Sequence, residues 1–345
     1  MKPKSINLAL QGGGAHGAFT WGVLDRLLDE DWLEIAAISG TSAGALNGAA
    51  LKSGLVRDGR QGARDDLDWL WSQVSEVHDL RLTRWIGALF PVPEIVNRWM
   101  EAFTPVAMAD AFGRIVSPYD SGPFYVNPLA RIVERFHYDE VCAEAGPRLF
   151  VSATNVRTGK IRVFSGAEIS CDAILASACL PNVFRAVEIE DPATGRTEAF
   201  WDGGFTGNPA LFPLFEADLP RDIVVVNINP LMRDGIPKTP AEIEDRINEI
   251  SFNSSLLREL RAISFVRRLI ADGSVIEGRM KDVLMHLVAD DAVMTSLRAD
   301  SKIAPGQGTL SRLKAAGQSA ADRFLDAHAD DLGQRASVDL VAMFS

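Results

Sequence analysis

Two stretches near the start of the chain share one pattern, in which a short apolar run ends in a glycine-rich turn and a helical segment follows. The apolar runs cover residues 6–10 and 35–38, and the helical segments cover about 19–28 and 43–52. Apolar residues recur every three or four positions in the first segment, and small residues dominate the second, with Gly54 as its expected C-cap. Strand, turn and helix in this order, twice over, predict βαβα units and a parallel sheet.

Further strands and helices are predicted along the rest of the chain. In chain order they are paired strands at 149–153 and 161–164, a helix at 171–179, strands at 200–202 and 223–228, a long amphipathic helix from about 243 to 270, a strand at 283–288 and a helix from about 310 to 332. Because the sequence has no repeats, we expect one domain over 5–345 with its core motifs in 5–230 and a C-terminal helical extension over about 240–345.

The middle of the chain, from about 65 to 135, departs from the α/β pattern. It is rich in tryptophan and repeatedly broken by proline, so we expect helices and irregular segments that form an embedded helical cap over the sheet. Trp69, Trp71 and Trp99 are most simply core residues. Residues 85–91 either belong to the core of the cap or form an apolar patch that meets a membrane surface.

Composition narrows the class of protein. The 345 residues are 47% hydrophobic and 23% charged, as in globular proteins, and their net charge of −11 argues against non-specific nucleic-acid binding. The three cysteines are scattered, and no segment has metal-ligand spacing, so we expect neither disulfides nor a metal site. No apolar run is long enough to span a bilayer, and no signal peptide is evident, so a cytoplasmic location is expected.

The pentapeptide Gly40-Thr41-Ser42-Ala43-Gly44 lies between a predicted strand and a predicted helix. A serine in G-x-S-x-G at such a turn is exposed at the carboxyl edge of a sheet, and the flanking glycines allow strand and helix to approach closely. The N-terminus of the helix adds a positive dipole beside the hydroxyl. Ser42 is therefore a candidate nucleophile, although the pattern also occurs by chance in glycine-rich chains.

The segment Gly12-Gly13-Gly14-Ala15-His16-Gly17 follows the first strand, and successive glycine N–H groups before a helix form an anion site. One alternative is a dinucleotide-binding oxidoreductase, because the segment fits G-x-G-x-x-G, but the acidic residue expected at the end of the second strand is missing. The other alternative is an oxyanion hole that faces Ser42 from the neighbouring strand. A purely structural turn is the third.

A third motif, Asp202-Gly203-Gly204, follows a predicted strand. It is either an ordinary Asp-Gly turn or a carboxylate held on a constrained loop. Serine chemistry needs a base, and a Ser–His–Asp triad in the order Ser42, Asp202, then His286 or His328 would match α/β-hydrolases. Ser42, however, comes too early for the usual α/β-hydrolase elbow, since only two strands precede it.

Together, G-G-G-x-x-G, G-T-S-A-G and D-G-G in this order resemble the patatin-like phospholipase family over most of residues 5–230. The resemblance implies an α/β/α sandwich with a mainly parallel sheet, a Ser42–Asp202 dyad without a catalytic histidine, and Gly12, Gly13 and Gly14 as oxyanion donors. Such a dyad requires a shielded Asp202 within hydrogen-bonding reach of Ser42, because burial makes a carboxylate a stronger base.

One position departs from the family. His16 stands where the family usually has Arg or Lys, which leaves open whether His16 supports the anion site or is an ordinary loop or core histidine. The remaining motif positions, which we expect to support the local backbone, are Gly17, Gly40, Gly44, Gly203 and Gly204.

The resemblance implies hydrolysis of lipid acyl esters, of the phospholipase A or lysophospholipase type, with a lipid as the binding partner and no cofactor. Transient contact with a membrane surface is a further expectation. The same dyad also serves esterases, thioesterases and polyester depolymerases, and a catalytically silent lipid-binding module is the non-enzymatic alternative. The sequence leaves acyl-chain length, headgroup and oligomeric state open.

Overall fold

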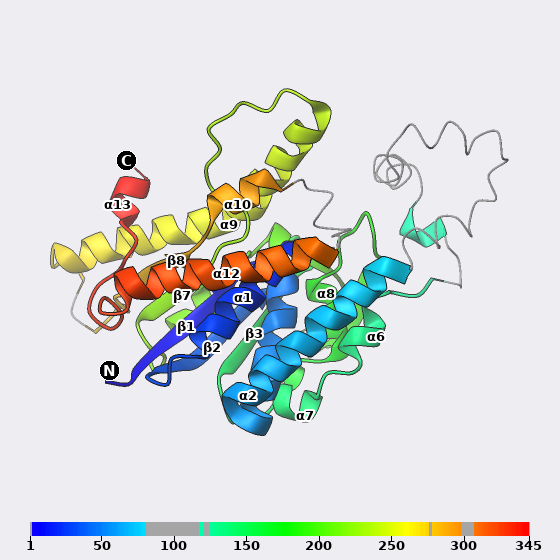
Figure 1. Ribbon diagram of the computed structural model, residues 1–345, viewed down its shortest axis with the longest axis horizontal. Coiled ribbons are helices and arrows are strands. Elements are labelled where there is room, and N and C mark those ends of the chain that lie inside the picture. Colours follow the sequence, from blue (N-terminus) through cyan, green and yellow to red (C-terminus); the bar gives the residue numbers. More distant parts are fainter. Residues whose placement is uncertain are drawn as a thin grey trace.

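The computed structural model describes residues 2–80, 117–120, 125–192, 194–275, 278–297 and 307–344. Most of the expected cap, including residues 85–91 and Trp99, lies outside these ranges. Within them, a mixed sheet lies between two helical layers (Figure 1). Its strands are β1 Lys4–Leu10, β2 Leu33–Thr41, β3 Arg148–Asn155, β4 Ile161–Ser165, β5 Val187–Asp191, β6 Arg196–Asp202, β7 Asp222–Val226 and β8 Leu284–Val288.

The order of strands along the sheet is β5-β6-β3-β2-β1-β7-β8, and β4 also pairs with β3. Five neighbouring strands, β3-β2-β1-β7-β8, are parallel to one another, whereas β4, β5 and β6 join the sheet by antiparallel pairing. The helices are α1 Gly17–Leu27, α2 Ala43–Leu80, α6 Ala130–Val133, α7 Tyr138–Val141, α8 Cys171–Ser177, α9 Pro240–Ala271, α10 Asp291–Ser296, α12 Gln307–His328 and α13 Leu340–Met343. Short 3₁₀ turns include η1 Gly14–His16, η4 Gly203–Phe205 and η5 Phe212–Phe215.

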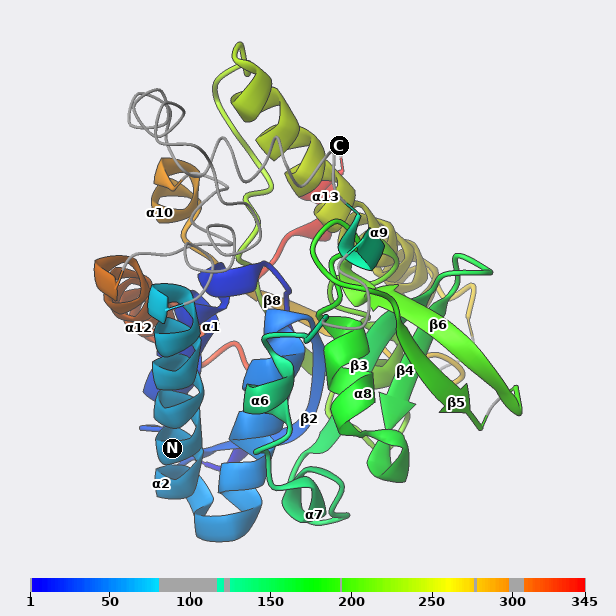
Figure 2. The same cartoon turned by 90° about the vertical axis from the view of Figure 1, so that its right-hand side faces the viewer.

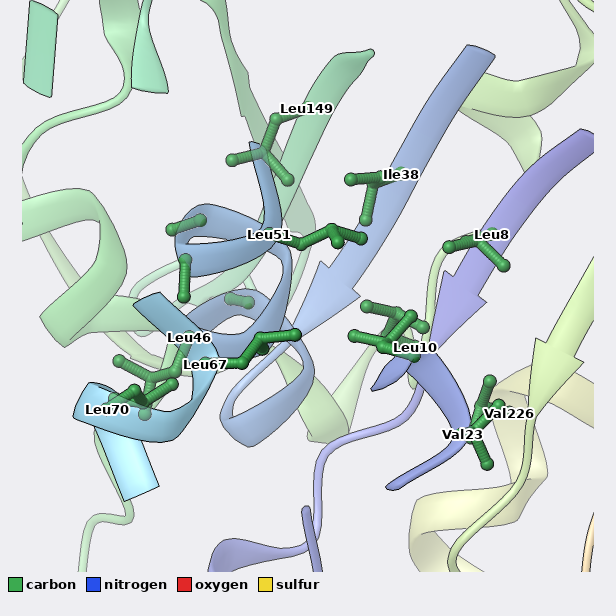
Figure 3. Close-up of a cluster of buried hydrophobic side chains, with 14 of the residues drawn as sticks. Leu8, Leu10, Val23, Ile38, Leu46, Leu51, Leu67, Leu70, Leu149 and Val226 are labelled. Atoms are coloured by element: carbon green, nitrogen blue, oxygen red, sulfur yellow. The ribbon is translucent and has the colours of Figure 1, made fainter. Parts of the chain in front are cut away.

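Alternate side chains of the central strands enter different helical layers. Leu8 and Leu10 of β1 pack with residues of α1, α2, α8 and α12, whereas Ala9 packs with residues of α9. Figure 2 shows α2 and α12 on one side of the sheet and α9 on the other. Figure 3 shows the larger core, where strand leucines face Leu46, Leu51 and other residues of α2. This period-two burial confirms the expected α/β/α sandwich.

The predicted helix end at Gly54 is wrong. Helix α2 continues past it and breaks at Asp58 and Gly59, where Gly59 has a φ of 63°. An added Cβ on Gly54 would lie 2.2 Å from the carbonyl oxygen of Gly62, and one on Gly62 would lie 2.5 Å from the carbonyl oxygen of Gly54. Gly54 therefore lets the two arms of α2 touch, and Gly59 makes the turn between them.

The C-terminal part of the chain is built into the domain. Strand β8 extends the parallel sheet beyond β7, as the apolar run at 283–288 predicted. Helix α12 packs so closely on α1 that an added Cβ on Gly317 would lie 2.0 Å from the carbonyl oxygen of Phe19. Helix α9 covers the opposite face of the sheet through Leu256, Leu260 and Ile263.

Candidate active site

The register of the sheet brings the three motifs together. Leu10 pairs with Gly40 between β1 and β2, so the turns that follow these two strands lie side by side. Thr41 pairs with Ser152 of β3, and the next residue of β3, Ala153, pairs with Asp202 of β6. Ser42 and Asp202 therefore lie at the same level on either side of β3, at the carboxyl edge of the parallel strands.

Ser42 occupies a sharp strand-to-helix turn. Its φ of 55° lies in the left-handed region, which non-glycine residues seldom adopt, and its exposed fraction is 7%. The Ser42 N–H donates to the Ser177 hydroxyl over 2.9 Å. An added Cβ on Gly44 would lie 2.1 Å from the carbonyl oxygen of Leu10. An added Cβ on Gly40 would lie 2.5 Å from the carbonyl oxygen of Gly44. The two flanking glycines thus allow the close approach that the turn needs.

Asp202 is fully buried at the end of β6. Its Oδ1 accepts the Gly204 N–H over 2.7 Å, whereas Oδ2 is buried without a partner at hydrogen-bond geometry among the described residues. Burial raises the pKa of Asp202 to about 7, although the hydrogen bond from the Gly204 N–H and the proximity of the Ser42 hydroxyl oppose that rise. The Ser42 hydroxyl is close enough to interact with this carboxylate, but the pair lacks a hydrogen bond of conventional geometry.

The glycines after Asp202 make room for its surroundings. An added Cβ on Gly203 would lie 2.2 Å from the carbonyl oxygen of Ser152. One on Gly204 would lie 2.3 Å from the Phe252 ring of α9 and 3.0 Å from Oδ1 of Asp202. The Asp-Gly-Gly sequence therefore serves close packing of the carboxylate between β3 and α9.

The glycine loop after β1 lies directly against Ser42. An added Cβ on Gly12 would lie 2.7 Å from the Cβ of Ser42. The Gly12 N–H donates to Oδ1 of Asn208 over 2.6 Å, so it is already committed within the protein, and the expectation that it stabilises an oxyanion is revised. The N–H groups of Gly13 and Gly14, by contrast, have no acceptor within the described part of the chain.

His16 and Gly17 lie at the junction between the glycine loop and α1. His16 is the last residue of η1 and is 2% exposed. An added Cβ on Gly17 would lie 2.7 Å from the Cβ of Ala43, which is the first residue of α2, and 3.1 Å from the Trp71 ring. Gly17 thus brings the loop against the start of α2, next to Ser42.

The two histidines considered for a triad lie elsewhere. His286 is in the middle of β8, three strands from β2 in the sheet, and its ring nitrogens hydrogen-bond to Asp222 and Ser337. His328 is at the end of α12, where it hydrogen-bonds to Asp331. Neither ring hydrogen-bonds to Ser42 or Asp202, so the structure gives no support to a triad built on His286 or His328.

Four buried amide side chains near the glycine loop were not anticipated from the sequence. They hydrogen-bond to one another and to backbone groups around Gly12, and they are Gln11, Asn208, Asn229 and Asn253. A signal for two of them exists, since Gln11 and Asn229 follow apolar runs that end at the same edge of the sheet. Asn208 and Asn253 carry no comparable sequence signal.

A cavity of about 680 Å³ lies away from this site, between the two arms of α2 and residues 135–137, with Trp69 and Phe136 in its walls. Over the described ranges, no group of three or more His, Cys, Asp or Glu side chains is placed to hold a metal ion. In the same part of the chain, no helix is long and apolar enough to cross a membrane.

Helices on both faces of a mostly parallel sheet, with these three motifs at one edge, define a patatin-like α/β architecture. The sequence matches the family described as patatin-like phospholipase over residues 8–217, and the chain belongs to this family. Family membership supports a lipid-hydrolase activity. No curated protein matches the sequence significantly.

Two solved structures are among those that match. One is VipD from Legionella pneumophila, with 15% sequence identity and a TM-score of 0.40, where the match covers 95% of this chain and 67% of VipD. The other is ExoU in the ExoU–SpcU complex of the Pseudomonas aeruginosa type III secretion system, with 16% sequence identity and a TM-score of 0.33. This match covers 96% of this chain and 62% of the ExoU chain. The chain thus spans less than two thirds of the ExoU chain, and TM-scores this low add nothing to the functional argument.

Proposed function

We propose that the protein is a lipid acyl hydrolase that cleaves carboxylic esters through a Ser42–Asp202 dyad. The observation that carries the proposal is the convergence of Ser42, buried Asp202 and the glycine loop at one edge of the sheet. A carboxylate with a pKa near 7 is a far better base at neutral pH than an ordinary aspartate, whose pKa lies near 4.

In the proposed mechanism, the Asp202 carboxylate takes the proton of the Ser42 hydroxyl as its oxygen attacks the ester carbonyl carbon. The N–H groups of Gly13 and Gly14 stabilise the tetrahedral oxyanion, each by a factor of about 10²–10³ in rate. The carbonyl re-forms as the alcohol leaves with the proton from Asp202, and an acyl-Ser42 ester remains. Water then gives a proton to Asp202 and attacks this ester, and the proton returns to Ser42 as the fatty acid leaves.

The substrate in this proposal is a lipid ester of the phospholipase A or lysophospholipase type. Phe205 supports an apolar substrate, because it directly follows Gly204, is 40% exposed and lies 5.6 Å from the Phe252 ring, between ring centroids. Transient contact with a membrane surface and a cytoplasmic location belong to the same proposal. Other carboxylic esters and thioesters are the alternative substrates, since the same dyad chemistry acts on them.

The oxidoreductase alternative has less support. In the dinucleotide fold an acidic side chain at the carboxyl end of the second strand holds the ribose. Strand β2 ends at Thr41, and Glu34 is its second residue, at the opposite end. In addition, the Ser42 turn packs directly against Gly12, the first glycine of the loop that would have to hold the dinucleotide.

A substrate panel tests the proposal. Phospholipid, lysophospholipid, neutral-lipid, p-nitrophenyl ester and acyl-thioester substrates are offered to the wild type, Ser42→Ala and Asp202→Asn, with His286→Ala as a control that changes a buried histidine outside the site. We expect ester hydrolysis by the wild type and His286→Ala, and a loss of at least about 10³-fold in both site variants. Full activity in Ser42→Ala or Asp202→Asn contradicts the dyad. Inactivity of the wild type on every ester, with lipid binding intact, favours the silent module.

A further inference from the structure

A cluster of four buried amide side chains lies against the side of the glycine loop opposite to solvent. Gln11 and Asn208 are 0% exposed, Asn229 is 1% exposed and Asn253 is 3% exposed. Gln11 follows β1 and Asn229 lies beyond the end of β7, the neighbouring parallel strand, while Asn253 belongs to α9. Buried amides need hydrogen-bond partners, and here those partners include the backbone of Gly12.

Both polar groups of Gly12 are held by this cluster. Its N–H donates to Oδ1 of Asn208 over 2.6 Å. Its carbonyl oxygen accepts Nδ2 of Asn229 over 2.8 Å and Nδ2 of Asn208 over 3.2 Å. Two donors on one carbonyl oxygen fix the direction of that carbonyl group.

The direction of the Gly12 carbonyl also fixes the Gly13 N–H. The two groups belong to one planar trans peptide, in which C=O and N–H point in opposite directions. Since the carbonyl points into the amide cluster, the Gly13 N–H points away from it, and no described residue accepts it. A donor held in advance in one direction is what stabilisation of an oxyanion requires.

We propose that Asn208 and Asn229 are positioning residues that lock the Gly12–Gly13 peptide and thereby aim the Gly13 N–H at the oxyanion. This inference rests on the proposed function and adds to it the identity of the principal donor and of the groups that hold it. Neither asparagine touches the reacting atoms in this account. They act through the backbone of the glycine loop.

Gln11 joins the two asparagines into one unit. Its Oε1 accepts the backbone N–H of Ile228 over 2.9 Å, the backbone N–H of Asn229 over 3.1 Å and Nδ2 of Asn229 over 3.2 Å. Its Nε2 donates to the carbonyl oxygen of Asn208 over 3.2 Å and to Oδ1 of Asn253 over 3.1 Å. Because both ends of Gln11 are occupied, a shift of either asparagine would break further buried hydrogen bonds.

Helix α9 anchors the unit from outside the region that matches the family, residues 8–217. Nδ2 of Asn253 donates to the carbonyl oxygens of Asn229 and Pro230 over 3.2 and 3.1 Å. The Ser255 hydroxyl accepts the Asn208 N–H over 3.0 Å. The geometry of the oxyanion site therefore depends on a helix that begins at Pro240.

The test replaces amides of the cluster and one amide outside it. Asn229→Leu keeps much of the side-chain volume but removes the closer of the two donors to the Gly12 carbonyl oxygen, and Asn253→Ser removes the anchor from α9 without touching the loop. Asn7→Leu is the matched control, because Asn7 is a fully buried amide of β1 whose Nδ2 donates to the carbonyl oxygens of Pro220 and Asp222. For each variant, kcat and KM are measured on a p-nitrophenyl ester, together with the inhibition constant of a trifluoromethyl ketone and the thermal unfolding midpoint.

The trifluoromethyl ketone distinguishes positioning from stability. Its adduct with Ser42 carries an oxyanion, so its inhibition constant reports the oxyanion site and not ground-state binding. We expect Asn229→Leu to lower kcat by about 10²-fold and to weaken the inhibitor by a similar factor, with KM changed less than about threefold. Asn253→Ser should show about a tenfold effect on both, and Asn7→Leu should lose stability but keep kcat and inhibition.

Each outcome either supports or overturns the positioning role of the two asparagines. Wild-type kcat and inhibition in Asn229→Leu overturn the inference, as does a loss of kcat without weaker inhibition, or an equal loss in Asn7→Leu. If Asn229→Leu does not fold, Asn253→Ser decides by the same criteria. Failure of the proposed function is recognised separately, because wild-type protein would then hydrolyse no ester or would keep its activity in Ser42→Ala.

Discussion

At the scale of single residues, Asp202 is the group whose environment matters most. Its position after a strand and before two glycines was predictable, and so was its need for shielding, because the sequence supplies no histidine motif for a conventional base. In the structure Asp202 is fully buried, beside β3 and next to Gly204, against which the Phe252 ring packs. In the amide cluster, Asn208 and Asn253 were not predictable, because an isolated Asn in a sequence is far more often a turn or surface residue.

The pKa of Asp202 predicts the pH dependence of catalysis. A base must be deprotonated, so kcat/KM should rise tenfold per pH unit below pH 7 and level off above it. Burial also raises the pKa of Glu259 to about 7, so Glu259→Gln serves as a control and should keep the inflection. A profile that is flat from pH 5 to pH 9 would contradict the role of Asp202.

The same burial has a cost for folding. The pKa of Asp202 in the folded state, about 7, lies above the ordinary value of 3.8, so the folded state binds the proton more tightly than the unfolded state. Stability is therefore lost as pH rises from about 4 to 7, and Asp202→Asn should be more stable than the wild type at pH 8 by a few kcal/mol. Urea unfolding at pH 8 and pH 5 measures this, and the difference should shrink at the lower pH. An Asn variant that is less stable at pH 8 would refute the expectation.

The contact between Gly12 and Ser42 gives a steric prediction. A methyl group at Gly12 would lie 2.7 Å from the Cβ of Ser42 and 2.8 Å from the carbonyl oxygen of Thr41, so the loop or the nucleophile must move. We expect Gly12→Ala to lose about 10²-fold or more in kcat/KM, because small displacements at a reacting centre cost that much. Gly308→Ala, where no atom lies within 4 Å of the added Cβ, should keep full activity. Normal kinetics in Gly12→Ala would mean that the loop is not part of the site.

At the scale of elements, periodicity predicted most strands and helices, and packing explains the exceptions. Strand β5 is not among the predicted strands, although Val187 and Ile189 alternate with two glutamates in the pattern of a half-buried strand. The predicted helix end at Gly54 falls inside α2, because the sequence alone does not distinguish a glycine that lets two helix arms touch from one that ends a helix. Tertiary contacts of this kind cannot be deduced from local patterns.

The contact between α1 and α12 can be tested through Gly317. An added Cβ there would lie 2.0 Å from the carbonyl oxygen of Phe19, so Gly317→Ala must separate the two helices. We expect a loss of roughly 1–3 kcal/mol in the free energy of unfolding. Gly308→Ala on the same helix meets nothing within 4 Å and should be neutral or slightly stabilising. Equal stability of the two variants, measured by urea unfolding, would contradict the packing.

At the scale of the whole molecule, the sheet and its helical layers extend well beyond the region that matches the family. Residues after 217 supply β7 and β8 of the parallel sheet, the helix α9 on one face and α12 on the other. The sequence predicted β7 within the core motifs of residues 5–230, and the later elements as a helical extension with one late strand. It did not reveal that Phe252 of α9 packs against Gly204, next to Asp202, or that α9 supports the glycine loop through Asn253.

A chain shortened to residues 1–230 tests this integration. It would lack β8 together with α9 on one face of the sheet and α12 on the other, and so would expose core residues such as Phe19 and Val225. We expect it to lose cooperative thermal unfolding, followed by circular dichroism, and to lose ester hydrolysis. A shortened chain that unfolds cooperatively and keeps activity would show that the C-terminal part is a separate addition.

In the proposed function, Ser42 at the edge of the sheet is the residue that carries the acyl group. The most direct measurement is peptide mass spectrometry after reaction with a fluorophosphonate, with Ser42→Ala treated in parallel. We expect a single adduct on Ser42, which is absent from the variant and forms faster as the pH rises through 7. An adduct on any other residue, or equal labelling of Ser42→Ala, would contradict it.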